Sequence, residues 1–233
     1  GYITLTTHNS RANLINNSEL NKLKAKSAFF KAEVSGKFNE NAFPNSEKLE
    51  LKVGAQVMFI KNDSSPEKRY FNWKIGVITS ISNDSVSVQC GNEIEEIVTE
   101  KEMWDNVNYS INEETKEIKE DIIGSFKQIP LRLAWAITIH KSQGLTFEKA
   151  IIDAEASFAH GQTYVALSRC TSLEGLVLKT PITSNAIIND RTVSVFNESV
   201  EENHPDESIL NQSEKKFQLN LISELFDFQP FLY

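Results

Sequence analysis

The feature that most constrains the fold of this sequence is a pair of motifs near its centre, joined by a strand-like run. The largely apolar run Ala134–Ile139 passes directly into the polar string His140–Gly144. Next comes Ala150–Asp153, which is typical of a buried strand ending in a carboxylate, and then Gln162–Arg169, which is typical of a helix. Helices alternating with buried strands predict an α/β fold with a parallel sheet.

The flanking segments extend this pattern. Tyr2–Thr7 alternates β-forming residues and predicts a strand, and the polar turn His8–Ser10 offers N-cap chemistry for a helix that continues to about Lys26. Further predicted elements are helices over Leu131–Gln143 and Asn185–Glu198 and a buried strand over Leu176–Leu178.

The middle of the chain, from Val53 onward, has a different texture. Short runs of β-forming residues follow one another closely and are separated by Asn-Asp or Gly-Asn turns. These runs are Gly54–Ile60, Gly76–Ile81, Ser85–Cys90 and Glu93–Thr99. Several short strands at close spacing predict a small barrel. We predict that the polar, acidic segment Lys101–Lys119 is a longer loop or hairpin, anchored by Trp104 and Tyr109.

Charge is distributed unevenly along the chain. The net charge of −8 is unfavourable for broad electrostatic capture of nucleic acid. The segment Glu198–Tyr233 contains eight acidic and two basic residues, whereas Leu131–Lys179 is close to neutral. Binding of nucleic acid in a local groove is therefore compatible with the sequence.

Composition narrows the class of protein. With 40% hydrophobic and 24% charged residues, the chain is typical of a globular protein. It has no apolar run near the roughly 20 residues that span a bilayer, so we expect no membrane association. Cys90 and Cys170 have neither disulfide nor zinc spacing, and the first residues do not resemble a signal peptide. We expect a cytoplasmic protein of bacterial intracellular type.

The C-terminal segment is acidic first and apolar last. Phe217–Phe228 has the spacing of an amphipathic helix. One interpretation is that this helix packs on the domain, and the other is that it binds a partner protein or another part of a longer chain.

The polar string His140–Gly144 has the chemistry of an anion-contacting turn. Its side chains donate hydrogen bonds that can reach phosphates and sugars, and Gly144 allows close approach of the backbone. The alternative is a polar helix end, where His140 and Lys141 only oppose the helix dipole. The whole string after an apolar run favours the binding role.

Arg169 is the second candidate. On a helix it shares a face with Gln162 and Ala166. A guanidinium that points from such a domain toward a neighbouring domain can neutralise charge on a transferred phosphate, the role called an arginine finger. The alternative is a surface salt bridge, for example to Glu174.

Four segments, in the family's order, resemble the C-terminal half of PIF-type helicases, in the RecD-like 5′-to-3′ branch of superfamily 1 DNA helicases. They are Thr6–Asn16 at the start of the second RecA-like domain, Leu51–Asn62 at the entry to its SH3-like insertion, Leu131–Asp153 as motif V and Gly161–Arg169 as motif VI. The match extends to about residue 197. The last two segments are highly specific.

The resemblance implies a second RecA-like (P-loop NTPase-type) domain with a parallel sheet, interrupted by a small all-β SH3-like barrel. The expected domains are 1–52 with 130–200 for the discontinuous RecA-like domain, 53–129 for the barrel and 201–233 for the tail.

Residue roles follow from the same resemblance. Arg169 would be the arginine finger that contacts the γ-phosphate of ATP, with Gly144 and Gln162 beside the nucleotide. Single-stranded DNA would be contacted by Thr6, Asn9, His140, Lys141 and Ser142.

The sequence departs from the family at Asn72-Trp73-Lys74-Ile75-Gly76, because the family usually has Asn-Gly before this turn. The family's barrel also faces DNA, so Trp73 could stack on a base. The preferred interpretation is that Trp73 is a hydrophobic plug in the barrel.

The chain also contains no G-x-x-x-x-G-K-[S/T] string, since Gly36-Lys37 lacks both the earlier glycine and a following hydroxyl residue. No acidic Walker B pair follows a suitable buried strand. We therefore expect that ATP and Mg²⁺ are bound mainly by an N-terminal RecA-like domain outside this chain, and that the chain alone is inactive.

The function expected from these observations is an ATP-dependent 5′-to-3′ DNA helicase, a hydrolase acting on ATP, of a family linked to DNA repair, recombination and telomere maintenance. Single-stranded DNA and the N-terminal domain are the expected partners. The alternatives are a RecD-like exonuclease subunit, a relaxase-helicase of mobile DNA, and a catalytically silent nucleic-acid-binding module.

Overall fold

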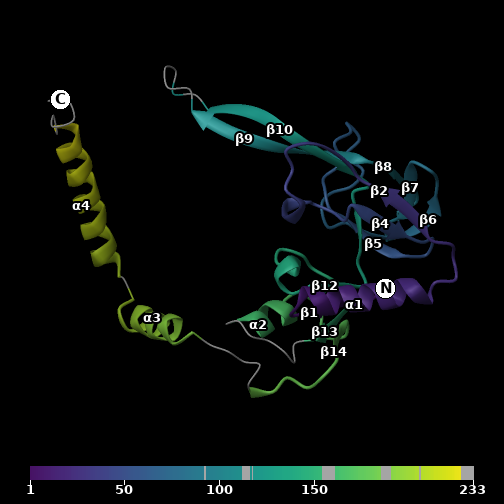
Figure 1. The fold of residues 1–233 in the computed structure, drawn as a ribbon. Coiled ribbons are helices and arrows are strands. Elements are labelled where there is room, and N and C mark those ends of the chain that lie inside the picture. The colour runs from purple at the N-terminus through teal and green to yellow at the C-terminus, as the bar shows by residue number, and fades with distance from the viewer. Residues whose placement is uncertain are drawn as a thin grey trace. The chain divides into compact units, whose positions relative to one another are not determined.

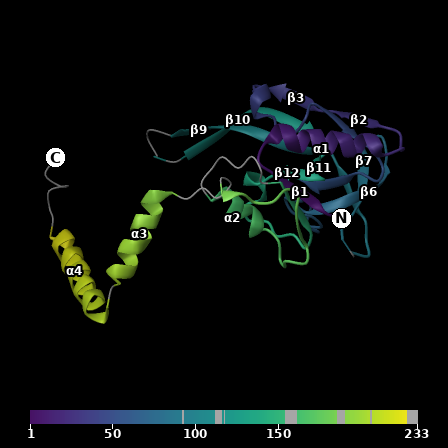
Figure 2. The same cartoon turned by 90° about the horizontal axis from the view of Figure 1, so that it is seen from below.

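The computed structural model describes the chain except for residues 92, 112–115, 117, 154–160, 185–189, 205 and 227–233. The chain divides into two compact units, Gly1–Ile188 and Asn189–Tyr233. Figures 1 and 2 show the mixture of helices and sheets in the first unit. No helix in the described ranges is both long and apolar enough to cross a membrane.

A four-stranded parallel sheet confirms the predicted α/β class. Its strand order is β12-β1-β13-β14, with β1 at Ile3–Thr6, β12 at Ala136–Thr138, β13 at Ala150–Asp153 and β14 at Leu176–Leu178. Apolar residues of β1, β12 and β13 are buried on it. The prediction of a buried strand was wrong for β14, since Val177 and Leu178 are each 42% exposed.

Helix α1 (Asn9–Lys22) packs against β1 and β12. It buries Ala12, Asn16 and Leu20, which lie on one helical face. The Asn16 amide donates to the carbonyl of Ala136 at 2.9 Å and accepts from its N–H at 2.8 Å. These paired hydrogen bonds fix the helix to β12.

The predicted helix over Leu131–Gln143 was wrong. This segment forms strand β11 (Leu131–Leu133), then β12, then the 3₁₀ turn η2 (His140–Ser142). The four residues 136–139 are all buried, and such a continuous apolar run does not distinguish a strand from a buried helix. Pairing with strands distant in sequence decided the outcome.

A five-stranded antiparallel sheet lies in the middle of the sequence. Its order is β11-β5-β6-β7-β8. The new strands are β5 (Gln56–Phe59), β6 (Ile75–Ile81), β7 (Ser85–Gln89) and β8 (Ile97–Glu100). All overlap predicted strands, although β8 starts later than the predicted strand from Glu93.

Strand β5 belongs to two cores at once. Val57 and Phe59 pack in the cluster of the antiparallel sheet, whereas Met58 packs in the cluster of the parallel sheet. Because successive strand residues point to opposite faces, β5 joins the two sheets through its side chains.

The acidic segment forms the predicted hairpin, but a longer one. Strands β9 (Glu102–Ile111) and β10 (Ile118–Gln128) pair along their length and form a long arm (Figure 1). Strand β3 (Glu33–Gly36) adds to the base of β10. Trp104 packs against Phe126 as predicted for an anchor, whereas Tyr109 is 65% exposed and anchors nothing in the described chain.

The remaining elements are short or helical. Strands β2 (Ala28–Lys31) and β4 (Lys48–Leu51) form a two-stranded sheet, and η1 (Glu40–Ala42) is a 3₁₀ turn. Helix α2 (Gln162–Leu167) confirms the helix predicted there.

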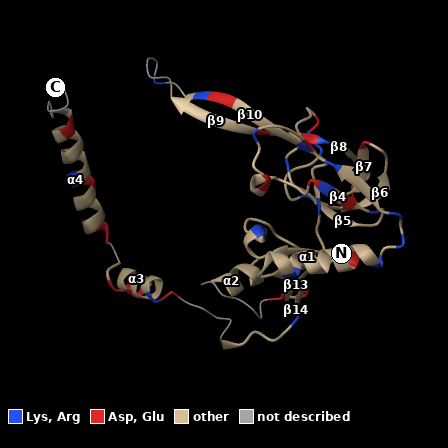
Figure 3. Ribbon diagram, viewed as in Figure 1, with Lys and Arg blue, Asp and Glu red and all other residues tan. Residues whose placement is uncertain are grey.

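The second unit contains α3 (Arg191–Glu202) and α4 (Glu207–Leu225). The described part of α3 lies later than the predicted helix over Asn185–Glu198, whose first residues fall outside the described ones. Neither helix has a buried residue, and acidic residues lie in the C-terminal half of α3 and recur along α4 (Figure 3).

Candidate functional site

The carboxyl end of the parallel sheet brings together two of the predicted DNA-contacting residues. Lys141, in the turn after β12, donates from Nζ to Oδ1 of Asn9 at 3.0 Å, although 132 residues separate them. Asn9 opens helix α1, so the contact joins the first motif to motif V. Burial and the positive charge of Arg132 lower the pKa of Lys141.

The other motif V residues occupy different environments in the same turn. His140 is exposed, whereas Ser142 is fully buried and its hydroxyl donates to the carbonyl of Ile139 at 2.7 Å. Gly144 has a φ of +80°, a left-handed conformation that glycine adopts readily because it has no side chain. Ser142 therefore shapes the turn that presents His140 and Lys141.

Thr6 ends β1 and lies opposite Thr138 and Asp153 in register. Its side chain is fully buried, and its hydroxyl has no hydrogen-bond partner in the described part of the chain. The predicted contact of Thr6 with DNA stays a prediction, and its backbone carbonyl already accepts from Ile139 at 2.8 Å.

Arg169 follows α2 and is held by three hydrogen bonds. Its Nε donates to the carbonyl of Val165 at 3.0 Å, Nη1 to that of Leu145 at 3.1 Å, and Nη2 to the Ser168 hydroxyl at 3.0 Å. Leu145 immediately follows Gly144, so motifs V and VI touch. Within the described ranges the guanidinium makes no ion pair with Glu174, the alternative considered for it.

Gln162 begins α2 and is buried, as are Thr163 and Ala166. The helix starts after Gly161, whose φ of +67° places it in the left-handed region. Gln162 is therefore enclosed at the base of the helix that carries Arg169, and its predicted place beside a nucleotide stays a prediction.

A charged cluster at the same sheet edge escaped sequence reasoning. The Asp153 carboxylate, 1% exposed, receives Arg11 Nε at 2.6 Å and Lys179 Nζ at 3.0 Å. Arg11 lies in the first turns of α1, and Lys179 follows β14. An aspartate at the end of an apolar strand was the available signal, but its partners are distant in sequence.

Trp73 lies at the junction of the two sheets. It was predicted to plug the barrel, but it packs instead against the cluster around the parallel sheet, which contains Ile3, Leu5 and Met58. Its backbone has a φ of +77°, and its N–H donates to the carbonyl of Phe59 at 2.7 Å. It lines two cavities of about 550 and 560 Å³.

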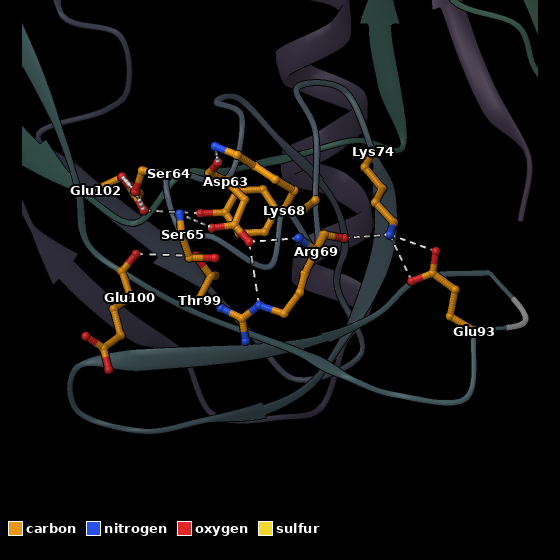
Figure 4. Close-up of polar contacts among 11 residues, drawn as sticks. Asp63, Ser64, Ser65, Lys68, Arg69, Lys74, Glu93, Thr99, Glu100 and Glu102 are labelled. Atoms are coloured by element: carbon orange, nitrogen blue, oxygen red, sulfur yellow. Dashed lines mark hydrogen bonds and ion pairs between the residues drawn. The ribbon is translucent and has the colours of Figure 1, made fainter.

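The loop that carries Trp73 is held by a polar network (Figure 4). Buried Asp63 accepts from the N–H groups of Ser65 and Arg69, each at 2.9 Å, and pairs with Arg69 Nε at 3.5 Å. Burial raises the pKa of Asp63, but these hydrogen bonds and the Arg69 charge outweigh it, so the pKa lies below its ordinary value. Lys74 pairs with Glu93 at 2.7 Å.

Tyr70 completes this loop. Its ring stacks on Phe59 with centroids 4.1 Å apart, and its hydroxyl donates to Glu102 at 3.3 Å. Burial is the main reason that its pKa rises to about 12.

Across the described residues, no three His, Cys, Asp or Glu side chains gather as metal ligands.

The chain is similar to known proteins in sequence and in fold. The chain is 31% identical over 185 residues to the ATP-dependent DNA helicase Pif1 of Campylobacter jejuni and 35% identical over 182 residues to human PIF1. It resembles the solved structure of Bacteroides Pif1 bound to ssDNA with a TM-score of 0.71, at 39% identity over 86% of this chain. The chain is homologous to part of the PIF-type helicases.

The similarity to Pif1 proteins extends to other solved states. Bacteroides Pif1 in complex with ADP-AlF4 matches with a TM-score of 0.74 and 38% identity. The chain spans 40% of the Campylobacter Pif1, 26% of human PIF1 and 46% of the ssDNA-bound Bacteroides structure. No family model matches it. The resemblance to PIF-type helicases is therefore confirmed for the part of those proteins that this chain covers.

Proposed function

We propose that this chain works within an ATP-dependent 5′-to-3′ DNA helicase, where it grips single-stranded DNA and completes a nucleotide site formed with another domain. The observation that carries the proposal is the contact between the two specific motifs. Arg169 lies against Leu145 at 3.1 Å, directly beside Gly144. The residue proposed to sense the nucleotide is therefore in direct contact with the segment that follows the turn proposed to grip DNA.

On the nucleotide side, Arg169 is the residue that would act on phosphate. A guanidinium stays charged and offers several donors in a fixed fork, which suits stabilisation of charge on a phosphoryl group. In the present arrangement its donors are bonded to carbonyls and a hydroxyl of its own domain. Approach of an ATP phosphate held by the other domain would exchange some of these bonds for charge-assisted ones.

On the DNA side, Lys141 and Asn9 form a prearranged pair beside exposed His140. Lysine and amide donors of this kind position a phosphate backbone without reading sequence. Buried Ser142 and Thr6 would support the turn and the strand that hold this pair. Bacteroides Pif1 has been solved with ssDNA, which supports a strand-binding role.

ATP and Mg²⁺ would be held mainly by the other RecA-like domain, since this chain has no phosphate-cradling loop. We therefore expect the 233-residue chain alone to hydrolyse ATP no faster than background. Measurable DNA-stimulated ATP hydrolysis by the purified chain would contradict the proposal that another domain holds the nucleotide.

The test of the proposal is substitution of Arg169 in the protein that also contains the nucleotide-binding domain. We expect Arg169→Ala to lower DNA-stimulated ATPase activity by about 10³-fold, as for other arginine fingers, with single-stranded DNA binding unchanged. Arg169→Lys should not restore activity, because lysine lacks the fork. The exposed Arg191→Ala is the matched control. Unchanged ATPase activity in Arg169→Ala would favour the silent nucleic-acid-binding module.

A further inference from the structure

One cavity has a composition that the contacts described so far do not explain. It measures about 550 Å³ and is bounded by helix α1 on one side. Asn9, Asn13 and Asn17 line it at intervals of one helical turn, so their side chains lie on the same face. A row of amides along a cavity wall supplies both hydrogen-bond donors and acceptors.

Two of these amides are available to a ligand. Asn9 accepts from Lys141, and neighbouring Asn16 is engaged with Ala136. Among the described residues, Asn13 and Asn17 have no hydrogen-bond partner, and both are exposed. They face a cavity large enough for a small ligand, since such sites measure roughly 300–1,000 Å³.

Part of the cavity lining is apolar. Met58, Leu133 and Ile137 line it from β5, β11 and β12. Trp73 lines it as well, from a backbone position with a φ of +77°. That conformation is strained for any residue other than glycine, and such strain occurs more often at functional sites.

Three basic residues line the cavity. Lys48, Arg132 and Lys141 line it, against a single carboxylate, that of Glu50. Lys141 lies at the end of α1 where the DNA-contacting pair is proposed. The cavity lining thus combines an aromatic residue, apolar side chains, unpaired amides and positive charge.

We propose that this cavity binds one unstacked nucleobase of the DNA strand, with Trp73 packing on the base and Asn13 and Asn17 bonding its polar edge. The inference rests on the proposed function, because Asn9 and Lys141 must hold the adjoining phosphate. Aromatic stacking accepts every base, and a side-chain amide can both donate to and accept from a base edge. The cavity would add base contacts to a grip otherwise made through phosphates.

The experiment measures equilibrium binding of the chain to labelled single strands by fluorescence anisotropy. One strand carries bases, and a second strand of the same length, about 12 nucleotides, is abasic. We expect wild type to bind the base-bearing strand at least tenfold more tightly, as a stacked base contributes. In Asn13→Ala/Asn17→Ala this preference should fall about fivefold, with abasic binding unchanged.

Two further variants serve as a control outside the cavity and as a test of the stacking ring. Asn21→Ala removes an exposed amide from the same helix outside the cavity and should change neither affinity. Trp73→Gly removes the ring while relieving the backbone strain, and should also reduce the preference for bases. If both strands bind equally to wild type, or the double variant keeps the preference, the base pocket is refuted and the helicase proposal stands. If wild type binds neither strand, both proposals fail.

Discussion

The carboxyl end of the parallel sheet and the loop 61–74 each contain a buried aspartate, but the partners that compensate its negative charge differ in how far away they lie in the sequence. Asp153 is compensated by Arg11 and Lys179, which are distant in the sequence. Asp63 is compensated by Ser65 and Arg69, two and six residues away. The first cluster joins α1, β13 and the segment after β14, whereas the second only folds a loop.

The difference shows that contacts between distant parts of the sequence are concentrated at the parallel sheet. The residues that join motifs V and VI and the first helix lie at the carboxyl end of a parallel sheet, where open α/β sheets bind ligands. Their partners come from three separated parts of the chain. The Asp63 contacts stay within the loop, and other residues of the same loop, such as Tyr70 and Lys74, join it to Glu102 and Glu93.

The largest expected effect comes from leaving Asp153 unpaired. In Arg11→Ala/Lys179→Ala a buried carboxylate loses both cations, which should lower the free energy of unfolding by about 3–5 kcal/mol. Each single substitution should cost less than half of that, because one cation remains. Urea denaturation of the single and double variants measures the coupling. Strict additivity would show that the cluster is not a unit, and Asp153→Asn in the double variant should recover stability.

A smaller long-range effect is expected at Asn16. Asn16→Ala removes both hydrogen bonds to Ala136 and leaves buried backbone groups without their partner, at about 2–3 kcal/mol. Asn21→Ala on the same helix should be within about 0.5 kcal/mol of wild type. Hydrogen exchange of β12 gives a direct reading: its protection should fall in Asn16→Ala alone. Unchanged protection would show that the Asn16 hydrogen bonds do not stabilise β12.

In the loop, Asp63→Asn should act locally and change the pH dependence. The folded pKa of Asp63 is lowered, so its contribution is present above the unfolded carboxyl pKa of about 3.9 and is lost as the pH falls through the folded pKa. We expect about 1–2 kcal/mol of destabilisation at neutral pH and a shallower loss of stability below about pH 4. A variant with the wild-type acid profile would contradict this assignment.

A stability effect of about the same size is expected at Gly144. Gly144→Ala meets no atom within 4 Å but must adopt a φ of +80°, which costs about 1–2 kcal/mol. Gly91→Ala, with a φ of +52° and equal space, is the matched control in the antiparallel region. Both should lose similar stability, measured by thermal unfolding. Only Gly144→Ala should also weaken binding of single-stranded DNA, because it disturbs the turn of Lys141.

Sequence reasoning succeeded where local patterns were sufficient. The helix before Arg169, the helix after Asn9 and the hairpin that ends in β10 follow from periodicity and turn residues. It failed for Leu131–Gln143, because an apolar run pairs in a sheet or packs as a helix depending on its neighbours. It also misplaced Trp73. Strand β5 presents alternate residues to two cores, and Trp73 packs against the core of the parallel sheet rather than that of the antiparallel sheet.

The sequence by itself determined the family, the α/β class and the identity of the motif residues, because short strings such as His140–Gly144 and Gly161–Arg169 are specific. Only the tertiary structure decided which of these residues meet. The contacts of Lys141 with Asn9, of Arg169 with Leu145 and of Asp153 with its two cations join positions far apart in sequence. Such contacts depend on strand order and register, which local propensity does not encode.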